Sequence, residues 1–465
     1  MISVDLLVIG GGPGGYHAAF DAADRGMKVA LADENATLGG VCLNRGCIPS
    51  KALLHVAALI QETRRASEWG ATYADPSIDL DKLRAWKDAT VQRMAKGLDE
   101  LARQRKVQTF QGRAKLTGAS SAEIAGHGRV EFKHCLLATG SRPKSPSLFH
   151  PLGNLLMDST SALALENIPQ KLLVLGGGYI GLEMGTVYAA LGSRVTVVEM
   201  QSALLPGVDS DLVRPLARNL ASMFETIHLD TKVTSASIVN GEVQVGMQKG
   251  SEETLETFSK ILVSVGREPN TQALGLEHTA VQLEEGGFIK TDSNGRTDEP
   301  GIFAIGDIVA GAMLAHKASH DAQRAINWIE RGEAGKSSVI PAVVFTDPEI
   351  AWCGLSETDA RRKGIAFHVS RFPWSASGRA QAMGRGEGLT KLILEPESNK
   401  ILGMGVVGVN AGELIGEGVL AMNMGASAKD LAHAVHPHPT LSETISEAAF
   451  AGMGQAIHIY KRPRK

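Results

Sequence analysis

The sequence predicts an α/β protein with two Rossmann-like nucleotide-binding domains followed by a C-terminal α+β domain. At 465 residues the chain is too long for one hydrophobic core, so several domains are expected. One order of segments occurs twice: an apolar strand, a glycine-rich loop, a helix, a second strand and an acid. This order is typical of nucleotide-binding units. From Pro341 onward, runs typical of strands (391–394, 401–409) and of helices (411–423, 441–452) indicate a separate α+β domain.

The composition excludes several classes of protein. Apolar residues make up 43% of the chain and charged residues 21%, as in an ordinary globular protein. The formal net charge of -3 argues against a general nucleic-acid binder. The sequence shows neither a cleavable signal peptide nor an apolar run of membrane-spanning length. We therefore expect a cytoplasmic protein without membrane insertion, with a mature mitochondrial matrix protein as the alternative.

The first nucleotide-binding unit is N-terminal. Residues 4–9 predict a buried strand, a glycine loop follows, and residues 28–32 predict the second strand, which ends at Asp33. In such a loop the first glycine permits a tight turn, the second lets the backbone approach a pyrophosphate, and the third lets the helix pack close to the strand. The helix N-terminus attracts the anion, and the acid accepts hydrogen bonds from a ribose. The predicted site residues are Gly10, Gly12, Gly15 and Asp33.

The second unit repeats this pattern, with strands at 171–175 and 194–198 around a helix at 182–191. Both units place the acid at the same offset from the first glycine, since 33 − 10 and 199 − 176 are both 23. One such motif alone could be a glycine-rich turn without a ligand, but a matched pair favours two dinucleotide sites. A carboxylate at the ribose position repels a 2′-phosphate and so favours NAD over NADP. The predicted residues are Gly176, Gly178, Gly181 and Glu199.

A close pair of cysteines occurs in a chain that has only four. A helix is expected to begin near Pro49, which would place Cys47 at a helix N-terminus, where a thiolate is stabilised. Cys42 lies one short loop away and is within reach of a disulfide. A structural disulfide is one alternative, although such bonds are rare in reducing compartments. Half of a zinc site is another, although no second close cysteine pair would complete it. The two nucleotide sites favour a redox role.

Two histidines and an acid occur within residues 436–443, at the expected start of a helix. Such a group is typical of a general base with an orienting carboxylate. A surface histidine pair that caps the helix is the alternative, and the segment taken alone favours it. The basic segment 461–465 predicts a solvated chain end rather than a binding site.

Together, these segments resemble the pyridine-nucleotide disulfide oxidoreductase family over nearly the whole chain. The most specific matches are residues 39–51 and 436–443. Further segments that resemble the family's nucleotide-binding parts are 138–140, 266–267, 304–307 and 313–317. The resemblance implies a homodimer whose chain has four domains: FAD-binding (1–145), NAD-binding (146–270), central and returning to the FAD (271–340), and interface or dimerisation (341–465).

The resemblance also implies a role for each site residue. Cys42 would exchange with a dithiol substrate, and Cys47 would be the thiolate that contacts the flavin. Lys51 would lie near the flavin ring and pair with Glu183. His438 would be the base, with Glu443 orienting it. The FAD-binding residues would be Gly10, Gly12, Gly15, Asp33, Lys51, Gly112, Thr139, Gly140, Asp307 and Ala315. The NAD-binding residues would be Gly176, Gly178, Gly181, Glu199, Val233, Gly266 and Arg267.

The implied reaction is oxidation of protein-bound dihydrolipoyl groups to lipoyl, with reduction of NAD+ to NADH, through a Cys42–Cys47 disulfide and without a metal. The implied partners are the lipoyl domains of 2-oxo acid dehydrogenase complexes or of the glycine cleavage system. A flavoprotein NADH oxidase and a flavin-binding structural subunit are the alternatives. The chain departs from the family at Asp33, where glutamate is usual, and at residues 319–321, which are less acidic than usual.

Overall fold

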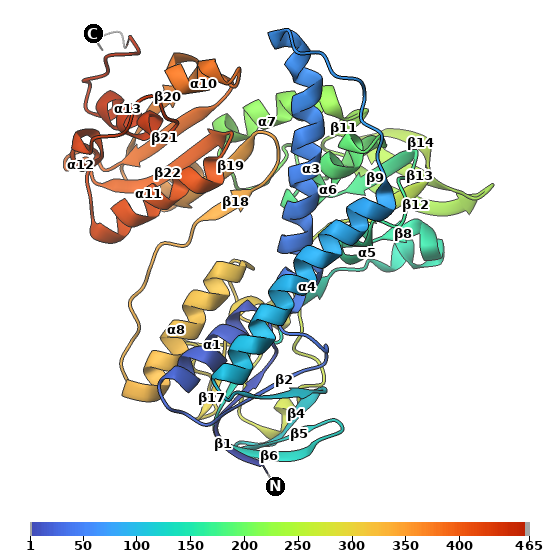
Figure 1. The fold of residues 1–465 in the computed structure, drawn as a ribbon, viewed down its shortest axis with the longest axis vertical. Helices are drawn as coiled ribbons and strands as arrows, with labels where there is room; N and C mark the ends of the chain where they lie inside the picture. Colours follow the sequence, from blue (N-terminus) through green and yellow to red (C-terminus); the bar gives the residue numbers. More distant parts are fainter. Residues whose placement is uncertain (1, 461–465) are drawn as a thin grey trace.

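The computed structural model describes residues 2–460, so the basic segment 461–465 lies outside the described residues. The predicted fold class is confirmed: the chain forms separate sheets with helices packed on them. Figure 1 shows the N-terminal sheet at the bottom, the second sheet at the upper right and the C-terminal sheet at the upper left. The long helix α4 (Leu80–Gln104) reaches from the first sheet toward the second.

The first sheet has seven strands, and most of their pairings are parallel. The middle strand β1 (Ile2–Ile9) pairs Leu7 with Ala30 on one side and with Cys135 on the other. Its last four residues, 6–9, are apolar and buried because both faces of the sheet are covered there. Leu6 and Val8 pack with α1 (Pro13–Asp24) and α8 (Ala315–Arg331), and Leu7 and Ile9 pack on the other face with residues of 114–124. The other strands are β2 (Val29–Asp33), β3 (Gln108–Gln111), β4 (Ala114–Gly118), β5 (Ser121–Ile124), β6 (Gly128–Leu137) and β17 (Ile302–Ala304).

The second sheet is wholly parallel, and its strand order is β11-β10-β9-β15-β8. Strands β9 (Lys171–Leu175) and β10 (Arg194–Val198) have the predicted bounds. Helix α6 (Tyr179–Ala190) follows the glycine loop directly and so begins three residues before the predicted start at 182. The remaining elements here are β8 (Leu156–Met157), α5 (Ser159–Ala164), α7 (Ser210–Met223), β11 (Thr226–His228), β15 (Lys260–Val263) and the antiparallel strands β12 (Lys232–Val239), β13 (Glu242–Lys249) and β14 (Glu252–Phe258).

The C-terminal sheet is antiparallel, in the order β18-β19-β22-β21-β20. Helix α11 (Ala411–Met424) packs on β19 and β22, and α13 (Glu443–Gly452) packs on β20 and β21. The strands are β18 (Ala342–Val344), β19 (Glu349–Gly354), β20 (His368–Pro373), β21 (Leu389–Leu394) and β22 (Ile401–Gly408). The short helices are α9 (Glu357–Arg362), α10 (Gly378–Ala382) and α12 (Ala428–His433).

Two strands cross between the first and second sheets. They are β7 (Ser141–Pro143) and β16 (Arg267–Pro269), which pair with each other on the way out to the second sheet and on the way back. The chain then returns to the first sheet, where β17 pairs with β6. The division into four domains and its boundaries remain a prediction.

The largest apolar cluster joins the second sheet to the C-terminal sheet. It contains Leu53 of α3 (Cys47–Arg65), Val174 of β9, Leu212 of α7 and Val407 of β22, each at most 2% exposed. Helix α7 approaches β22 closely, since a Cβ added at Gly405 would lie 2.5 Å from Leu212. Among residues 2–460, no helix is both long enough and apolar enough to cross a membrane.

Candidate functional site

The first glycine loop has two positions that exclude larger side chains. Gly10 has a φ of +108°, and a Cβ added there would lie 2.3 Å from the Ala138 carbonyl oxygen. A Cβ at Gly15 would lie 1.8 Å from the carbonyl oxygen of Gly10. Gly12 differs, because the nearest atom to an added Cβ is 3.9 Å away. Gly12 is also the N-cap of α1, and no side chain caps that helix. The free N–H groups of α1 therefore offer an anion-binding position beside Gly12.

This loop opens on a cavity of about 620 Å³, a size typical of a small-molecule site. The cavity is lined by every residue predicted for FAD except Gly15, which lies behind the loop: Gly10, Gly12, Asp33, Lys51, Gly112, Thr139, Gly140, Asp307 and Ala315. Cys42, Cys47 and Glu183 line the same cavity. A helix N-terminus for a pyrophosphate, an acid for a ribose and a thiol pair thus share one space, which fits a dinucleotide with a redox-active end.

The acid of this site also fixes the glycine loop. One Asp33 carboxylate oxygen accepts the Gly11 N–H at 2.5 Å. The other accepts the Asn35 backbone N–H and its side-chain amide, both at 2.7 Å. The Arg45 guanidinium donates in turn to the Asn35 side-chain oxygen at 3.3 Å. The sequence pointed to Asp33 only as a ribose ligand, and these additional contacts show that the shorter acid also supports the loop.

The two cysteines are free thiols on neighbouring helices. Cys47 is the first residue of α3, close to the predicted start, but Cys42 lies in the short helix α2 (Gly40–Arg45) where a loop was expected. A hydrogen bond from the Cys42 thiol lowers the pKa of Cys47 to about 7 against the effect of burial, and the Lys51 ammonium contributes in the same direction. The same bond, with burial, raises the pKa of Cys42. The Cys47 backbone N–H at the start of α3 also lowers this pKa, and the neighbouring thiol is the first cause of the shift.

The predicted pair of Lys51 and Glu183 is present. Their Nζ and Oε2 atoms are 2.8 Å apart, and the Glu183 side chain is only 4% exposed. Ser50 Oγ donates to the same oxygen at 3.0 Å, and the Phe345 N–H donates to the other at 3.0 Å. The Lys51 ammonium also lies 4.4 Å from the centre of the Phe345 ring. Phe345 had no signal in the sequence, because only the docking of the C-terminal part brings it here.

The second glycine loop is built like the first. Gly176 has a φ of +101°, and a Cβ there would lie 2.6 Å from the Ser264 carbonyl oxygen. A Cβ added at Gly178 would meet nothing within 4 Å, and no side chain caps α6. Glu199 accepts the Gly177 and Gln201 N–H groups, each at 2.7 Å. The loop thus has the same open side and the same free helix N-terminus as an anion site.

The remaining residues predicted for NAD lie in different places. Val233 is on β12, packed against the apolar cluster under β13, and Gly266 lies just before β16, where its carbonyl accepts the Lys144 N–H. Arg267 lines the first cavity, where its guanidinium donates to the Ser141 hydroxyl at 2.7 Å and to the Ser141 carbonyl at 2.6 Å. That hydroxyl donates to Asp307 at 2.5 Å. Arg267 therefore supports a residue of the FAD set, and its contact with NAD remains a prediction.

The structure distinguishes the two histidines. His436 uses both ring nitrogens, contacting the Ala434 carbonyl and Glu417 at 2.9 Å each, and its side chain is 9% exposed. His438 Nδ1 lies 2.9 Å from Glu443, and its side chain is 79% exposed. Burial opposes ionisation of Glu443, but the Thr440 N–H and His438 hold the pKa of this carboxyl below its usual range. Because a carboxylate only accepts, it fixes the proton on Nδ1 and leaves Nε2 of His438 to accept a proton.

His438 and Glu443 do not line the cavity that holds the cysteines of the same chain. They precede and begin α13, in the C-terminal sheet's own layer of helices. The two groups predicted from the sequence are thus separate within one chain. The thiol pair lies on the dinucleotide cavity, and the oriented imidazole of His438 lies away from it, exposed on the surface.

The chain is similar to known proteins over nearly its whole length. Residues 4–322 match the family described as pyridine nucleotide-disulphide oxidoreductase, and residues 340–449 match its dimerisation domain. Dihydrolipoyl dehydrogenase of Vibrio parahaemolyticus is 43% identical over 96% of this chain and 95% of the relative. That of Thermus scotoductus is 43% identical over 99% and 100%. The solved Cu(II) complex of the HOCl-induced flavoprotein disulfide reductase RclA from Escherichia coli is 27% identical, with a TM-score of 0.86 over 97% of this chain and 99% of that one. The chain belongs to the pyridine nucleotide-disulphide oxidoreductase family.

Proposed function

We propose that the protein oxidises protein-bound dihydrolipoyl groups to lipoyl and reduces NAD+ to NADH through a Cys42–Cys47 disulfide. The observation that carries this proposal is the meeting of the thiol pair, the Lys51–Glu183 pair and the first glycine loop on one cavity. The identity to proteins named dihydrolipoyl dehydrogenase favours a lipoyl dithiol over other disulfide substrates.

Family membership confirms the two predicted cofactors, FAD and NAD. The residues of the cavity fit FAD, and we propose that Gly12 and the N-terminus of α1 bind its pyrophosphate and that Asp33 binds its ribose. We propose that Gly178, the N-terminus of α6 and Glu199 do the same for NAD. When bound, FAD supplies the two-electron chemistry that returns the thiol pair to the disulfide and reduces NAD+.

The proposed exchange begins at His438. Its Nε2 takes a proton from one substrate thiol, and the thiolate attacks the sulfur of Cys42, which breaks the disulfide and releases Cys47 as a thiolate. The second substrate thiol then attacks the substrate sulfur bound to Cys42, and its proton passes to the Cys42 sulfur as that bond breaks. This releases the lipoyl disulfide and leaves Cys42 as a thiol, while His438 holds the first proton. The substrate loses the two electrons that the cysteine pair gains. The low pKa of Cys47 and the raised pKa of Cys42 suit this outcome, in which Cys47 stays ionised and Cys42 is protonated.

We further propose that each site is shared between two subunits, since His438 is absent from its own chain's cavity and the chain carries a dimerisation domain. A base must come within hydrogen-bond reach of its proton, so the partner subunit's His438 would serve the Cys42–Cys47 pair. The lipoyl domains of 2-oxo acid dehydrogenase complexes or of the glycine cleavage system would be the external partners. We propose a cytoplasmic location, with the mitochondrial matrix as the alternative, because one relative is named a mitochondrial enzyme.

The activity is tested by following NAD+ reduction with dihydrolipoamide, repeated with NADP+ and with glutathione. We expect turnover with the first pair only. Anaerobic reductive titration should show that the enzyme accepts two electrons before the flavin absorbance bleaches. Oxidation of NADH by oxygen without any turnover of dihydrolipoamide would contradict the proposal and favour an oxidase.

Sharing of the site is tested by complementation. Cys47→Ser and His438→Ala subunits, each inactive, are mixed under conditions in which labelled subunits are seen to exchange. In a heterodimer with sites in trans, one site carries both changes and the other carries neither, so activity should reappear. A mixture that exchanges and stays inactive would show that His438 does not serve the partner's cysteines.

A further inference from the structure

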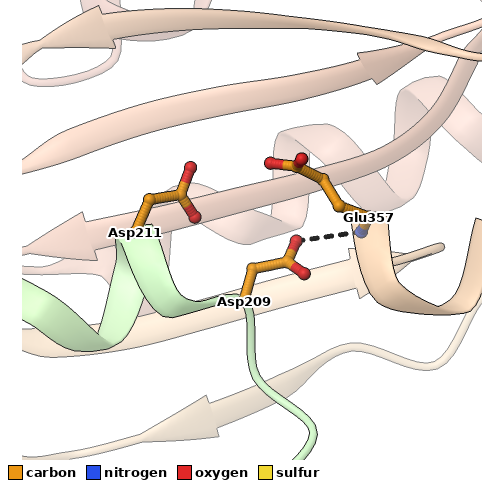
Figure 2. A group of neighbouring side chains, drawn as sticks. All are labelled: Asp209, Asp211 and Glu357. Carbon is orange, nitrogen blue, oxygen red and sulfur yellow. Dashed lines mark hydrogen bonds between the residues drawn. The ribbon is translucent and has the colours of Figure 1, made fainter. Parts of the chain in front are cut away.

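Three carboxylates outside the cavity that holds the cysteines point toward one another. Asp209, Asp211 and Glu357 have oxygens within 4.8 Å of each other, as Figure 2 shows. The arrangement resembles a cation site, but the Lys391 ammonium lies among them, 2.8 Å from Asp209, 2.8 Å from Asp211 and 2.7 Å from Glu357. The Lys391 side chain is 1% exposed. The lysine is thus the cation of this cluster, and its ammonium lies where a metal ion would have to bind.

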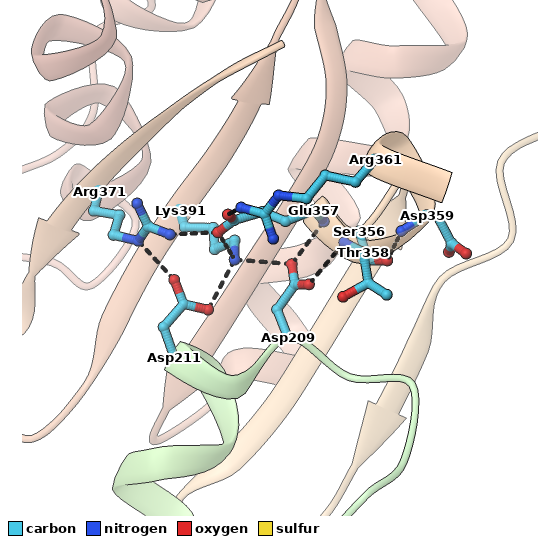
Figure 3. Close-up of polar contacts among 9 residues, drawn as sticks. All are labelled: Asp209, Asp211, Ser356, Glu357, Thr358, Asp359, Arg361, Arg371 and Lys391. Atoms are coloured by element: carbon cyan, nitrogen blue, oxygen red, sulfur yellow. Dashed lines mark hydrogen bonds and ion pairs between the residues drawn. The ribbon is translucent and has the colours of Figure 1, made fainter. Parts of the chain in front are cut away.

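The cluster joins two parts of the chain (Figure 3). Asp209 and Asp211 lie at the start of α7, beside the second sheet, whereas Glu357 begins α9 and Lys391 is on β21 of the C-terminal sheet. Arg371 of β20 also binds Asp211, at 2.6 Å, and contacts Glu357. Lys391, Arg371 and the adjacent Arg361 balance the three acids in charge. Desolvation works against ionisation of Asp211, but Lys391 and Arg371 together hold its pKa below the usual range.

Asp209 is held by the C-terminal part rather than by its own helix. It is the N-cap residue of α7, where an aspartate usually accepts an N–H of its own helix, yet no side chain caps α7. Its carboxylate instead accepts the Glu357 N–H at 3.0 Å and the Thr358 N–H at 3.4 Å, in addition to Lys391. The beginning of α7 is therefore attached to the C-terminal sheet through Asp209.

Asp209 ends the segment that begins at Glu199. Within residues 200–208, the Leu205 N–H donates to the Gly177 carbonyl at 2.9 Å. Leu204 packs on the same glycine, so that a Cβ there would lie 2.8 Å from its side chain. Glu199 in turn accepts the N–H of Gly177. The segment thus packs against Gly177 of the second glycine loop and is fixed at one end by Glu199 and at the other by Asp209.

We propose that Lys391 is a positioning residue for the NAD site. By holding Asp209 on the C-terminal sheet, it fixes residues 200–208 against Gly177 and so keeps Glu199 oriented for the adenosine ribose. This inference rests on the proposed NAD role of the second glycine loop. It makes NAD affinity depend on the packing between the second sheet and the C-terminal domain, and it leaves the flavin and dithiol sites unaffected.

The test compares Lys391→Met with Asp211→Asn and with the control Lys400→Met, an exposed lysine of the same domain. All are measured as the flavin-loaded dimer. Lys391→Met should raise both the KM for NAD+ and the dissociation constant for NAD+ by at least tenfold, and Asp211→Asn by about threefold. The flavin spectrum and the KM for dihydrolipoamide should stay within twofold of wild type, as should every constant of Lys400→Met. If Lys391→Met does not fold, because removing one partner leaves buried charges unpaired, Asp211→Asn decides the question.

The outcomes separate the two proposals. Variants that lose thermal stability but bind NAD+ as wild type does would show that the cluster only stabilises the fold, and would overturn the positioning role. Equal increases in the KM values of NAD+ and dihydrolipoamide would overturn it as well, since general loosening would then be the cause. Glu199→Ala is measured beside them. If it too leaves NAD+ binding unchanged, the assignment of the NAD site is wrong, and the positioning role is contradicted with it.

Discussion

The two glycine loops of this chain share one construction. Gly10 and Gly176 have φ values of +108° and +101°, and each loop's acid accepts the N–H of the next glycine and of the residue two positions after the acid. Their surroundings differ. Distant segments enclose the first loop in a cavity of about 620 Å³, whereas the second is bordered by exposed side chains such as Met200, which is 64% exposed. The same motif therefore suits a permanently bound cofactor in the first loop and an exchanging cofactor in the second loop.

The sharpest test of this difference is one substitution made in both loops. Gly10→Ala and Gly176→Ala each add a Cβ at a positive φ and within 2.3 Å and 2.6 Å of a backbone carbonyl oxygen. Each should cost about 3 kcal/mol or more. Gly10→Ala should yield protein without flavin absorbance, because the loop is a wall of the cavity. Gly176→Ala should keep its flavin and lose NAD+ binding. Flavin content and NAD+ titration check this, and loss of flavin from both variants would contradict it.

The second prediction concerns the thiol pair, which only the first site has. Cys47→Ser should lower dihydrolipoamide turnover by about a thousandfold or more while FAD stays bound. The two-electron-reduced wild type should show a long-wavelength absorbance from the Cys47 thiolate beside the flavin, which the variant lacks. Since the hydrogen bond from Cys42 lowers the pKa of Cys47 to about 7, the band should persist above this pH and fade as the pH falls through it.

A matched variant assigns the two thiols. Cys42→Ser keeps a hydroxyl that can donate to Cys47 and should keep the long-wavelength absorbance, although it abolishes turnover. Loss of the absorbance in Cys42→Ser together with its survival in Cys47→Ser would show that the two roles are reversed.

Local patterns allowed accurate predictions in both loops. Strands β9 and β10 have the predicted bounds because a buried parallel strand is a short apolar run that ends at glycine or an acid. Helix α2 escaped prediction, since its six residues lie between Gly39 and Gly46 and are too few to show a helical period. The thiol pair and the His438–Glu443 pair were found because each lies within a few residues of sequence.

Contacts between distant segments could not be predicted from local patterns. Arg267 was assigned to NAD from the family resemblance of residues 266–267, and the pairing of β16 with β7 carries it to the first cavity. Phe345 reaches Glu183, and Lys391 reaches Asp209, only because the C-terminal sheet docks on α6 and α7. These residues have ordinary local sequence, and their roles come from the packing of whole domains.

The third prediction concerns a substitution that should weaken NAD+ binding at the second loop and leave the first loop unchanged. Glu199→Ala should raise the KM for NAD+ by about 10- to 100-fold, because a hydrogen bond to a charged group is worth about 1.5–3 kcal/mol. The variant's preference for NAD+ over NADP+ should decrease, since the carboxylate that repels a 2′-phosphate is gone. Steady-state kinetics with both nucleotides measure this, with flavin content as the control. A wild-type enzyme that prefers NADP+ would contradict the assignment.

The smallest expected effect is that of a substitution at Gly178. This substitution should change ligand binding without disturbing the packing of the protein, because no protein atom lies near the added side chain. Its backbone is extended, with φ −79° and ψ 174°, and an added Cβ meets no protein atom within 4 Å. Gly178→Ala should therefore fold normally and even gain about 0.4–1 kcal/mol, since alanine restricts the unfolded chain. Its methyl group would stand where the NAD pyrophosphate approaches the backbone, so NAD+ affinity should fall a few-fold while the flavin site is unchanged. Gly12→Ala is the matched change in the first loop and should weaken FAD instead. Thermal unfolding, NAD+ titration and flavin retention measure the three effects. If Gly178→Ala binds NAD+ as wild type does, the pyrophosphate does not lie on the open side of the second loop. The two loops would then share a backbone structure but would not bind their nucleotides in the same way.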